Sequence, residues 1–177
     1  MGITGLNSLW TDANIVVKLN DDRIFTVGGK RKENSKTTIK TTVYDDTLLF
    51  DPKQFVWSLG PSLFEGRFHH SALPLKDGSV LVIGGEGING PLASVEKFGP
   101  FVSGASRSAP HSSGPDMLES RADHSATLLG DNRILVCGGA TTPVENLQPN
   151  SEPARRGRRT ATRVQALASC EIFDPGK

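Results

Sequence analysis

The chain has 177 residues, a length that suits one ordinary domain with a sizeable hydrophobic core. Its 20 basic and 19 acidic residues give a net charge of +1, so no overall field favours nucleic acid or a membrane as a partner. No apolar run approaches the roughly 20 residues that cross a bilayer. The first ten residues do not resemble a signal peptide.

The two cysteines, Cys137 and Cys170, are too few for a disulfide scaffold. We therefore expect two reduced thiols, with a single bridge between them as the alternative. The low cysteine content and the lack of a signal sequence favour a cytoplasmic location over a secreted one.

In chain order, short apolar or alternating runs predict ten strands separated by turns. Asp77-Gly78 and Asp131-Asn132 fall between paired runs and predict tight hairpins. The runs VLVIGG and ILVCGG are apolar throughout, as expected of strands covered on both faces. The predicted strands lie at residues 14–19, 23–27, 47–51, 55–59, 70–75, 79–83, 93–98, 124–129, 133–137 and 169–173.

The sequence contains three copies of one repeat. Residues 67–85 align without gaps on residues 121–139, with ten of 19 positions identical. Residues 92–100 match residues 167–175 at six of nine positions, and residues 14–29 with 47–52 form a weaker first copy. The glycine pairs that begin at Gly28, Gly84 and Gly138 lie 56 and 54 residues apart.

These repeats resemble the kelch family in the form found in galactose-oxidase-like propellers, whose repeats are about 50 residues long. The shared features are Arg-x-x-His-Ser-Ala-x-x-Leu, an apolar run into Gly-Gly, and Leu-Ala-Ser-x-Glu-x-Phe-x-Pro, over roughly residues 12–175. The resemblance implies an all-β fold, namely a β-propeller with four-stranded blades. It implies no activity, because kelch propellers serve as binding platforms, enzymes and carbohydrate-binding units. The first repeat departs from the pattern by lacking the Arg and His, and no fourth strand follows Pro175.

We expect a single propeller segment over residues 1–177, with blades at about 11–60, 67–104 and 121–177 and loop inserts at 101–120 and 141–166. Propellers close with about four to eight blades, so three leave the ring open. Either the chain is a fragment of a longer propeller, or copies complete the ring by self-association, as a six-bladed dimer does. Residues 2–10 are a candidate for the missing fourth strand, exchanged between molecules.

Ten of the 20 basic residues crowd into two segments that each join the second and third strands of a repeat. Such loops lie on one face of a propeller, where binding usually resides. The alternatives are a binding face for an acidic protein, a phosphate or a nucleic acid, and two solvated inserts without a ligand. The residues are Lys30, Arg31, Lys32, Lys36 and Lys40 in the first loop, and Arg155, Arg156, Arg158, Arg159 and Arg163 in the second.

Other motifs fail on their context. The G-x-G-x-x-G spelling at residues 85–90 is followed by Pro91 and a strand instead of the helix that a dinucleotide site needs, so we expect a hairpin. His70 and His124 occupy equivalent repeat positions, which favours a shared structural role over a metal site with His69. The repeated pairs Arg67/Arg121 and Glu96/Glu171 are expected to interact within or between blades.

We expect a protein-binding or scaffold module that needs no cofactor, with another, acidic protein as its partner. The sequence favours neither a nucleic acid nor a membrane in that role. Hydrolase, Walker and zinc motifs are missing from the sequence, and Tyr44 is the only tyrosine that a copper-radical oxidase site would have. The alternatives are a fragment of a carbohydrate-active propeller enzyme, of the oxidase or sialic-acid isomerase type, and a purely structural subunit of a larger assembly.

Overall fold

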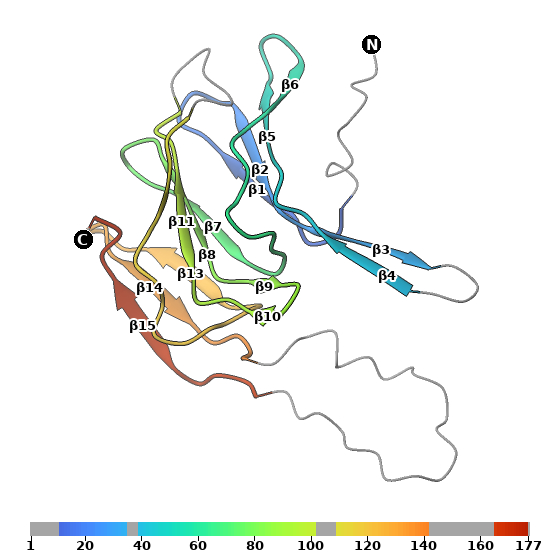
Figure 1. The fold of residues 1–177 in the computed structure, drawn as a ribbon. Helices are drawn as coiled ribbons and strands as arrows, with labels where there is room; N and C mark the ends of the chain where they lie inside the picture. Colours follow the sequence, from blue (N-terminus) through green and yellow to red (C-terminus); the bar gives the residue numbers. More distant parts are fainter. Residues whose placement is uncertain (1–10, 35–38, 102–108, 142–164, 177) are drawn as a thin grey trace.

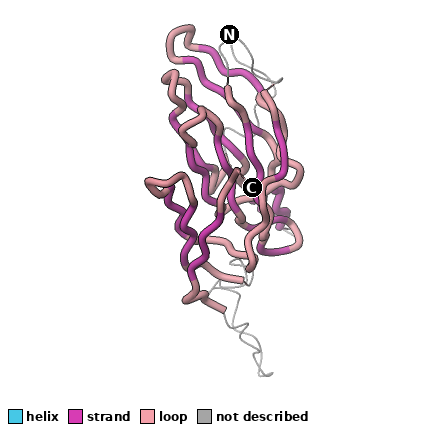
Figure 2. The backbone as a smooth tube through the Cα atoms, turned by 90° about the vertical axis from the view of Figure 1, so that its left-hand side faces the viewer, coloured by secondary structure: helices cyan, strands magenta, loops and turns pink. Residues whose placement is uncertain are grey.

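A computed structural model describes residues 11–34, 39–101, 109–141 and 165–176 of the chain. These residues form strands and loops without a helix, so the all-β prediction is confirmed (Figure 2). All ten predicted strands are present, each within about a residue or two of its expected ends. The candidate strand at residues 2–10 lies outside the described residues.

Three antiparallel sheets follow one another along the chain with the same strand order (Figure 1). The first sheet has the order β1-β2-β5-β6, with bounds Ile15–Lys18, Ile24–Val27, Thr47–Asp51 and Val56–Leu59. The second has the order β7-β8-β11-β12, with bounds Ser71–Pro74, Val80–Ile83, Val95–Phe98 and His111–Ser113. The third has three strands, β13-β14-β15, with bounds Ser125–Leu128, Ile134–Cys137 and Cys170–Phe173.

The described chain contains two further hairpins, each between the second and third strands of its sheet. Strands β3 (Lys30–Asn34) and β4 (Ile39–Val43) pair with each other and extend away from the sheets, and Lys30 at the base of β3 also forms a bridge with Asp12 (Figure 1). The first basic segment was predicted as a loop, and that prediction is wrong. The reason is that the β-branched run IKTTV pairs in register with KRKEN. The short strands β9 (Glu86–Gly87) and β10 (Gly90–Pro91) confirm the hairpin expected at the G-x-G-x-x-G spelling.

Strand β12 lies within residues 101–120, where the sequence predicts a loop. Its three residues pair with β11 in the register Glu96↔Ser113, Lys97↔Ser112 and Phe98↔His111. The Ser-rich sequence did not predict this strand, because β12 is stabilised by pairing with β11 and by contacts of the His111 ring with Phe64 and Phe98, and not by β propensity. The second sheet therefore has four strands, as the first does.

The hydrophobic core forms two layers, one on each side of the second sheet. Val80 and Val82 of β8 pack with Phe25 and Leu49 of the first sheet. Leu81 and Ile83 alternate to the opposite face, where they pack against strand β14 of the third sheet. All four β8 side chains are fully buried, which explains why this run is apolar throughout.

The outer faces of the first and third sheets keep large apolar side chains in contact with solvent. Val16 of β1 is 60% exposed and Ile172 of β15 is 50% exposed. None of the three sheets closes on itself. No helix in the described residues is long and apolar enough to span a membrane.

Candidate functional site

Glycine pairs join each sheet to the next. Gly28 and Gly29 have φ values of 63° and 109°, and Gly84 and Gly85 have φ values of 55° and 97°, in the region that side chains disfavour. The Gly29 N–H donates to the Arg67 carbonyl oxygen at 2.8 Å, and the Gly85 N–H donates to the Arg121 carbonyl oxygen at 2.9 Å. The second glycine of each pair therefore forms a backbone hydrogen bond with the first residue of the following repeat.

The two repeated arginines form matching buried networks. Arg67 donates to the carbonyl oxygens of Gly84 and Ser94, both at 3.0 Å, and forms an ion pair with Glu96. Burial lowers the pKa of the Arg67 guanidinium, and the charge of Glu96 opposes this effect. Both side chains are almost fully buried, so removing either one would leave the other charge buried without its partner and destabilise the fold.

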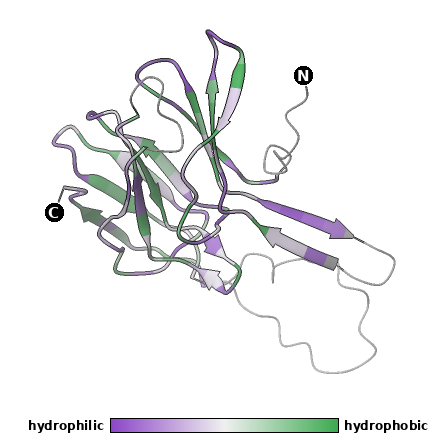
Figure 3. Ribbon diagram, turned by 45° about the horizontal axis from the view of Figure 1, so that its top comes forward, coloured by the Kyte–Doolittle hydropathy of each residue, from purple (hydrophilic) through white to green (hydrophobic). Residues whose placement is uncertain are grey.

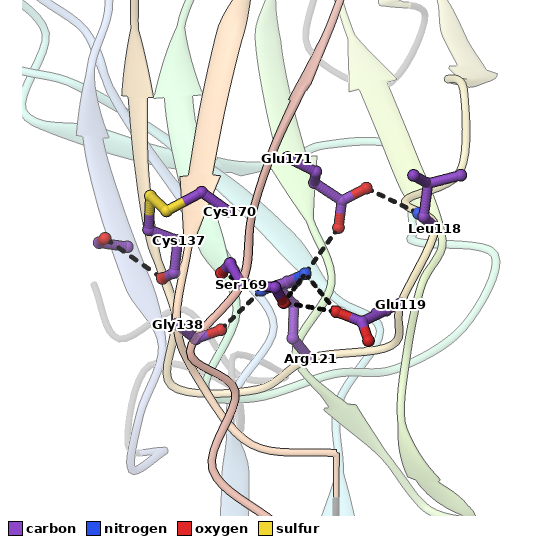
Figure 4. A network of polar contacts seen from close by, with 9 residues as sticks. Leu118, Glu119, Arg121, Cys137, Gly138, Ser169, Cys170 and Glu171 are labelled. Carbon is purple, nitrogen blue, oxygen red and sulfur yellow. Dashed lines mark hydrogen bonds and ion pairs between the residues drawn. A yellow bond between two sulfur atoms is a disulfide. The ribbon is translucent and has the colours of Figure 1, made fainter.

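Arg121 repeats the pattern in the third sheet (Figure 4). It donates to the carbonyl oxygen of Gly138 at 2.8 Å and to Glu171 Oε1 at 2.9 Å. It also contacts Ser169 and Glu119. The predicted pairing of Arg67 with Glu96 and of Arg121 with Glu171 is thus found within each sheet.

The histidines of the repeat lie between neighbouring sheets. The Cε1 atom of His70 approaches Gly28, and that of His124 approaches Gly84, each 3.0 Å from the place where a Cβ atom would stand. The ring nitrogens of both histidines are buried without a hydrogen-bond partner among the described residues. Burial lowers the pKa of His70 to about 3 and that of His124 to about 4, so both rings are neutral at pH 7. The equivalent placement fits the shared structural role that the repeat predicts.

His69 takes a different position from its neighbour. Its Nδ1 atom lies 2.5 Å from Oδ1 of Asp123, which occupies the matching position of the next repeat. Both residues have positive φ, 55° and 54°. Within the described ranges, no three His, Cys, Asp or Glu side chains come together as metal ligands.

The described basic residues of the first segment lie on the β3–β4 hairpin. Arg31, Lys32 and Lys40 are exposed, and Figure 3 shows β3 as a hydrophilic strand that projects from the sheets. Arg31 Nε lies 3.4 Å from Glu33 Oε1, which offsets part of the positive charge. The Lys30 ammonium instead lies 4.1 Å from the centre of the Phe68 ring, so Lys30 contributes to packing.

The remaining predicted basic residues, Lys36, Arg155, Arg156, Arg158, Arg159 and Arg163, lie outside the described residues. The described ends of the second segment, Thr141 and Gln165, are joined by a backbone hydrogen bond of 3.2 Å at the end of β14. That position is equivalent to the base of the β3–β4 hairpin in the first sheet.

The two cysteines form a disulfide, so the expectation of reduced thiols is wrong. Cys137 and Cys170 are directly opposite on β14 and β15, with Cα atoms 4.1 Å apart. Their counterparts in the second sheet, Ile83 and Val95, are paired in the same way. The repeat alignment therefore held the signal for this bridge, because equivalent positions of a repeat share their cross-strand partners.

A hollow of about 450 Å³ lies beside the Arg67–Glu96 pair. Glu65, Asp116, Ser94 and Ser113 also line it, so carboxylates and hydroxyls surround the buried guanidinium. A second hollow, of about 420 Å³, lies at the end of the second and third sheets that carries the tight turns. Sequence reasoning identified neither, because both form between segments that are distant in the chain.

A scan of the chain against models of known protein families gives no match. A search of curated proteins likewise finds no relative.

Proposed function

We propose that this chain forms part of a kelch-type β-propeller and acts as a binding or scaffold module. In this proposal the β3–β4 hairpin contacts an acidic surface of another protein. The observation that carries the binding proposal is the projection of a basic hairpin from packed sheets. A rigid scaffold that presents a projecting element is a common arrangement for recognition.

The repeated arrangement of the sheets supports the propeller part of the proposal. Each sheet has the same antiparallel order, and the contacts Gly29–Arg67 and Gly85–Arg121 recur between successive sheets. Successive blades of a propeller are packed face to face in this manner. Further repeats or a second copy would cover the apolar side chains Val16 and Ile172 at the two ends.

The charge of the hairpin supports an acidic partner. Arg31 and Lys32 are consecutive residues of β3, paired with Thr42 and Thr41. Because side chains alternate between faces along a strand, the two basic side chains lie on opposite faces of the hairpin. Because neighbouring positive charges attract an acidic surface and speed its encounter, such a hairpin favours an acidic protein.

Charge reversal tests this proposal. The triple variant Arg31→Glu, Lys32→Glu and Lys40→Glu should lose binding to poly-glutamate beads at moderate salt without a change in melting temperature. Lys30 is kept, since it packs on Phe68. The matched control reverses three exposed basic residues at the opposite end of the sheets, Lys53, Lys76 and Arg133.

The proposal holds if only the hairpin variant loses binding. Equal loss in both triple variants would show a net-charge effect, and retained binding in the hairpin variant would show that this ribbon has no part in it. Either result overturns the hairpin proposal. A duplex DNA probe run in parallel shows whether a nucleic acid competes for the same residues, and preferential DNA binding would contradict the choice of an acidic protein.

A further inference from the structure

The hollow beside Arg67 and Glu96, which we call the Arg67 hollow, has a volume of about 450 Å³, within the range of ligand-binding pockets. It lies at the end of the second sheet where β7 and β11 begin and β12 ends. Its walls come from three segments, within residues 64–67, 94–96 and 113–116. The hollow therefore does not depend on what covers the outer faces of the first and third sheets.

The Arg67 hollow carries more negative than positive charge. Three carboxylates line it, those of Glu65, Glu96 and Asp116, together with the guanidinium of Arg67. Burial lowers the pKa of this guanidinium, and the charges of all three carboxylates oppose the effect. Because one guanidinium offsets one carboxylate, two negative charges remain in the hollow to attract a positively charged ligand.

Two of the three carboxylates are open to a ligand. Glu96 is engaged with three neighbouring groups: it forms the ion pair with Arg67, accepts a hydrogen bond from the Phe64 N–H at 2.9 Å, and lies 2.7 Å from His111 Nε2. The carboxylates of Glu65 and Asp116 form no hydrogen bond or ion pair with the described residues. They are therefore the acceptors that the hollow offers.

The third sheet contains the same residues in a more closed arrangement (Figure 4). Glu119 is the counterpart of Glu65, and its Oε2 atom accepts hydrogen bonds from Arg121 at 3.2 Å and from the Ser169 hydroxyl at 2.5 Å. Glu65 instead lies against the β9–β10 hairpin, with its Oε1 atom 2.7 Å from the place where a Cβ atom of Gly87 would stand. Because Gly87 has no side chain, Glu65 has room to turn away from the buried arginine, and the hollow stays open.

Phe64 gives the hollow an aromatic wall. Its ring stacks on His111, with a centroid distance of 4.0 Å and an interplanar angle of 20°, so one face of the ring is covered. Phe64 is nevertheless 67% exposed, which leaves the other face free. A guanidinium can stack on such a face while its N–H groups point outward in its own plane to carboxylates.

The carboxylates are distributed around the hollow and do not meet at one point. Among the residues that the structure describes, no three His, Cys, Asp or Glu side chains come together as metal ligands. A calcium ion needs about six to eight oxygen ligands at about 2.3–2.6 Å from one centre. An organic cation whose donors are spread over several atoms fits this spacing better.

We propose that the Arg67 hollow binds the guanidinium of an arginine side chain on the surface of another protein. The carboxylates of Glu65 and Asp116 accept hydrogen bonds from its N–H groups, and its plane lies on the free face of Phe64. Arginine suits the site better than lysine, whose ammonium is a compact point charge without a flat face. Free arginine would bring its own carboxylate into a negatively charged site. The hollow and the β3–β4 hairpin take ligands of opposite charge, so either proposal can fail without the other.

A blocked peptide, acetyl-Gly-Arg-Gly-amide, tests the site when it is titrated into the ¹⁵N-labelled full chain. Amide shifts of Gly114 and Asp116 should saturate with a Kd of about 1 mM or lower. The same peptide with citrulline, whose side chain is a neutral urea, should bind at least about tenfold more weakly, because its hydrogen bonds to carboxylates lose the charge. No saturation by about 10 mM arginine peptide, or equal affinity for the citrulline peptide, overturns the proposal.

Variants of the chain locate the binding. The double variant Glu65→Gln and Asp116→Asn should weaken binding of the arginine peptide at least about tenfold without lowering the melting temperature. Glu119→Gln is the matched control from the equivalent position of the third sheet, and it should bind as the unaltered chain does. Phe64→Leu should also weaken binding, and it should fold, since Leu118 occupies the same position in the next repeat. Unchanged affinity in the double variant, or an equal loss in Glu119→Gln, means that the peptide binds elsewhere and the proposal fails.

Three competing ligands test the choice of an arginine side chain. The lysine peptide acetyl-Gly-Lys-Gly-amide, free arginine and calcium chloride are titrated under the same conditions. Each should bind more weakly than the arginine peptide or leave the Gly114 and Asp116 shifts unchanged. Tighter binding of any one of them at these amides would assign the hollow to a different cation and overturn the proposal.

Discussion

Gly84 and His124 lie in neighbouring sheets, and the His124 ring packs where a side chain of Gly84 would be. A Cβ atom on Gly84 would also stand 2.7 Å from the Arg121 carbonyl oxygen, on a backbone with φ of 55°. The glycine therefore serves two needs, an unusual backbone conformation and close approach of the next sheet. Gly28, His70 and the Arg67 carbonyl repeat this relationship.

Three alanine substitutions separate these two needs. Gly84→Ala should destabilise the fold by about 3 kcal/mol, because it adds crowding to backbone strain. Gly138→Ala should cost about 1 kcal/mol from strain alone, since its φ is 72° but nothing lies closer than 3.9 Å to the added atom. Gly130→Ala meets nothing within 4 Å and should have almost no effect. Urea unfolding of the three variants checks this order, and equal losses at Gly84 and Gly138 would show that sheet contact is unimportant.

The buried Arg67–Glu96 pair gives a second prediction. Glu96→Leu should destabilise the fold by about 3–5 kcal/mol, because it removes the buried carboxylate that forms the ion pair with the Arg67 guanidinium. Combining it with Arg67→Met should recover part of that loss in a double-mutant cycle. Additive losses in chemical denaturation would mean that the two side chains are not coupled.

The disulfide should stabilise the third sheet. It links positions 33 residues apart, and β15 is joined to the described sheet only through β14. Reduction should therefore lower the free energy of unfolding by about 2–4 kcal/mol. Replacing both cysteines with serine should give a similar loss and remove the response to reductant. An unfolding curve that is the same with and without reductant would contradict the predicted contribution.

The strands and the repeat were predictable, because apolar periodicity and glycine positions report directly on backbone structure. The β3–β4 hairpin was not, since Lys30, Arg31 and Lys32 have the composition of a solvated loop and their pairing depends on the Thr-rich partner strand. Strand β12 was hidden for a related reason: His111 is held by Phe64, Phe98 and Glu96, all distant in sequence. The disulfide could have been predicted from the repeat alignment, because Cys137 and Cys170 align with Ile83 and Val95, but that inference needs the strand register that pairs those two positions.

The two buried histidines predict a loss of stability in mild acid. Their pKa values, about 3 for His70 and about 4 for His124, lie below the ordinary value of 6.5. The unfolded chain therefore binds more protons, so the histidine contribution is fully present above pH 6.5 and declines as the pH falls toward 4. Each histidine adds a slope of about 1.4 kcal/mol per pH unit in that interval. His124→Gln should reduce the slope of unfolding free energy against pH, and an unchanged slope would show that folding does not lower the pKa of His124.

The proposal that this chain is an open propeller segment is tested most directly by its mass in solution. Light scattering after size exclusion, over a wide concentration series, should show association that increases with concentration, because Val16 and Ile172 leave apolar surface uncovered at the two ends. Val16→Glu, on an exposed position of the first sheet, should weaken that association without lowering the melting temperature. A compact and monodisperse monomer at every concentration, unfolding in one cooperative transition, would contradict the account.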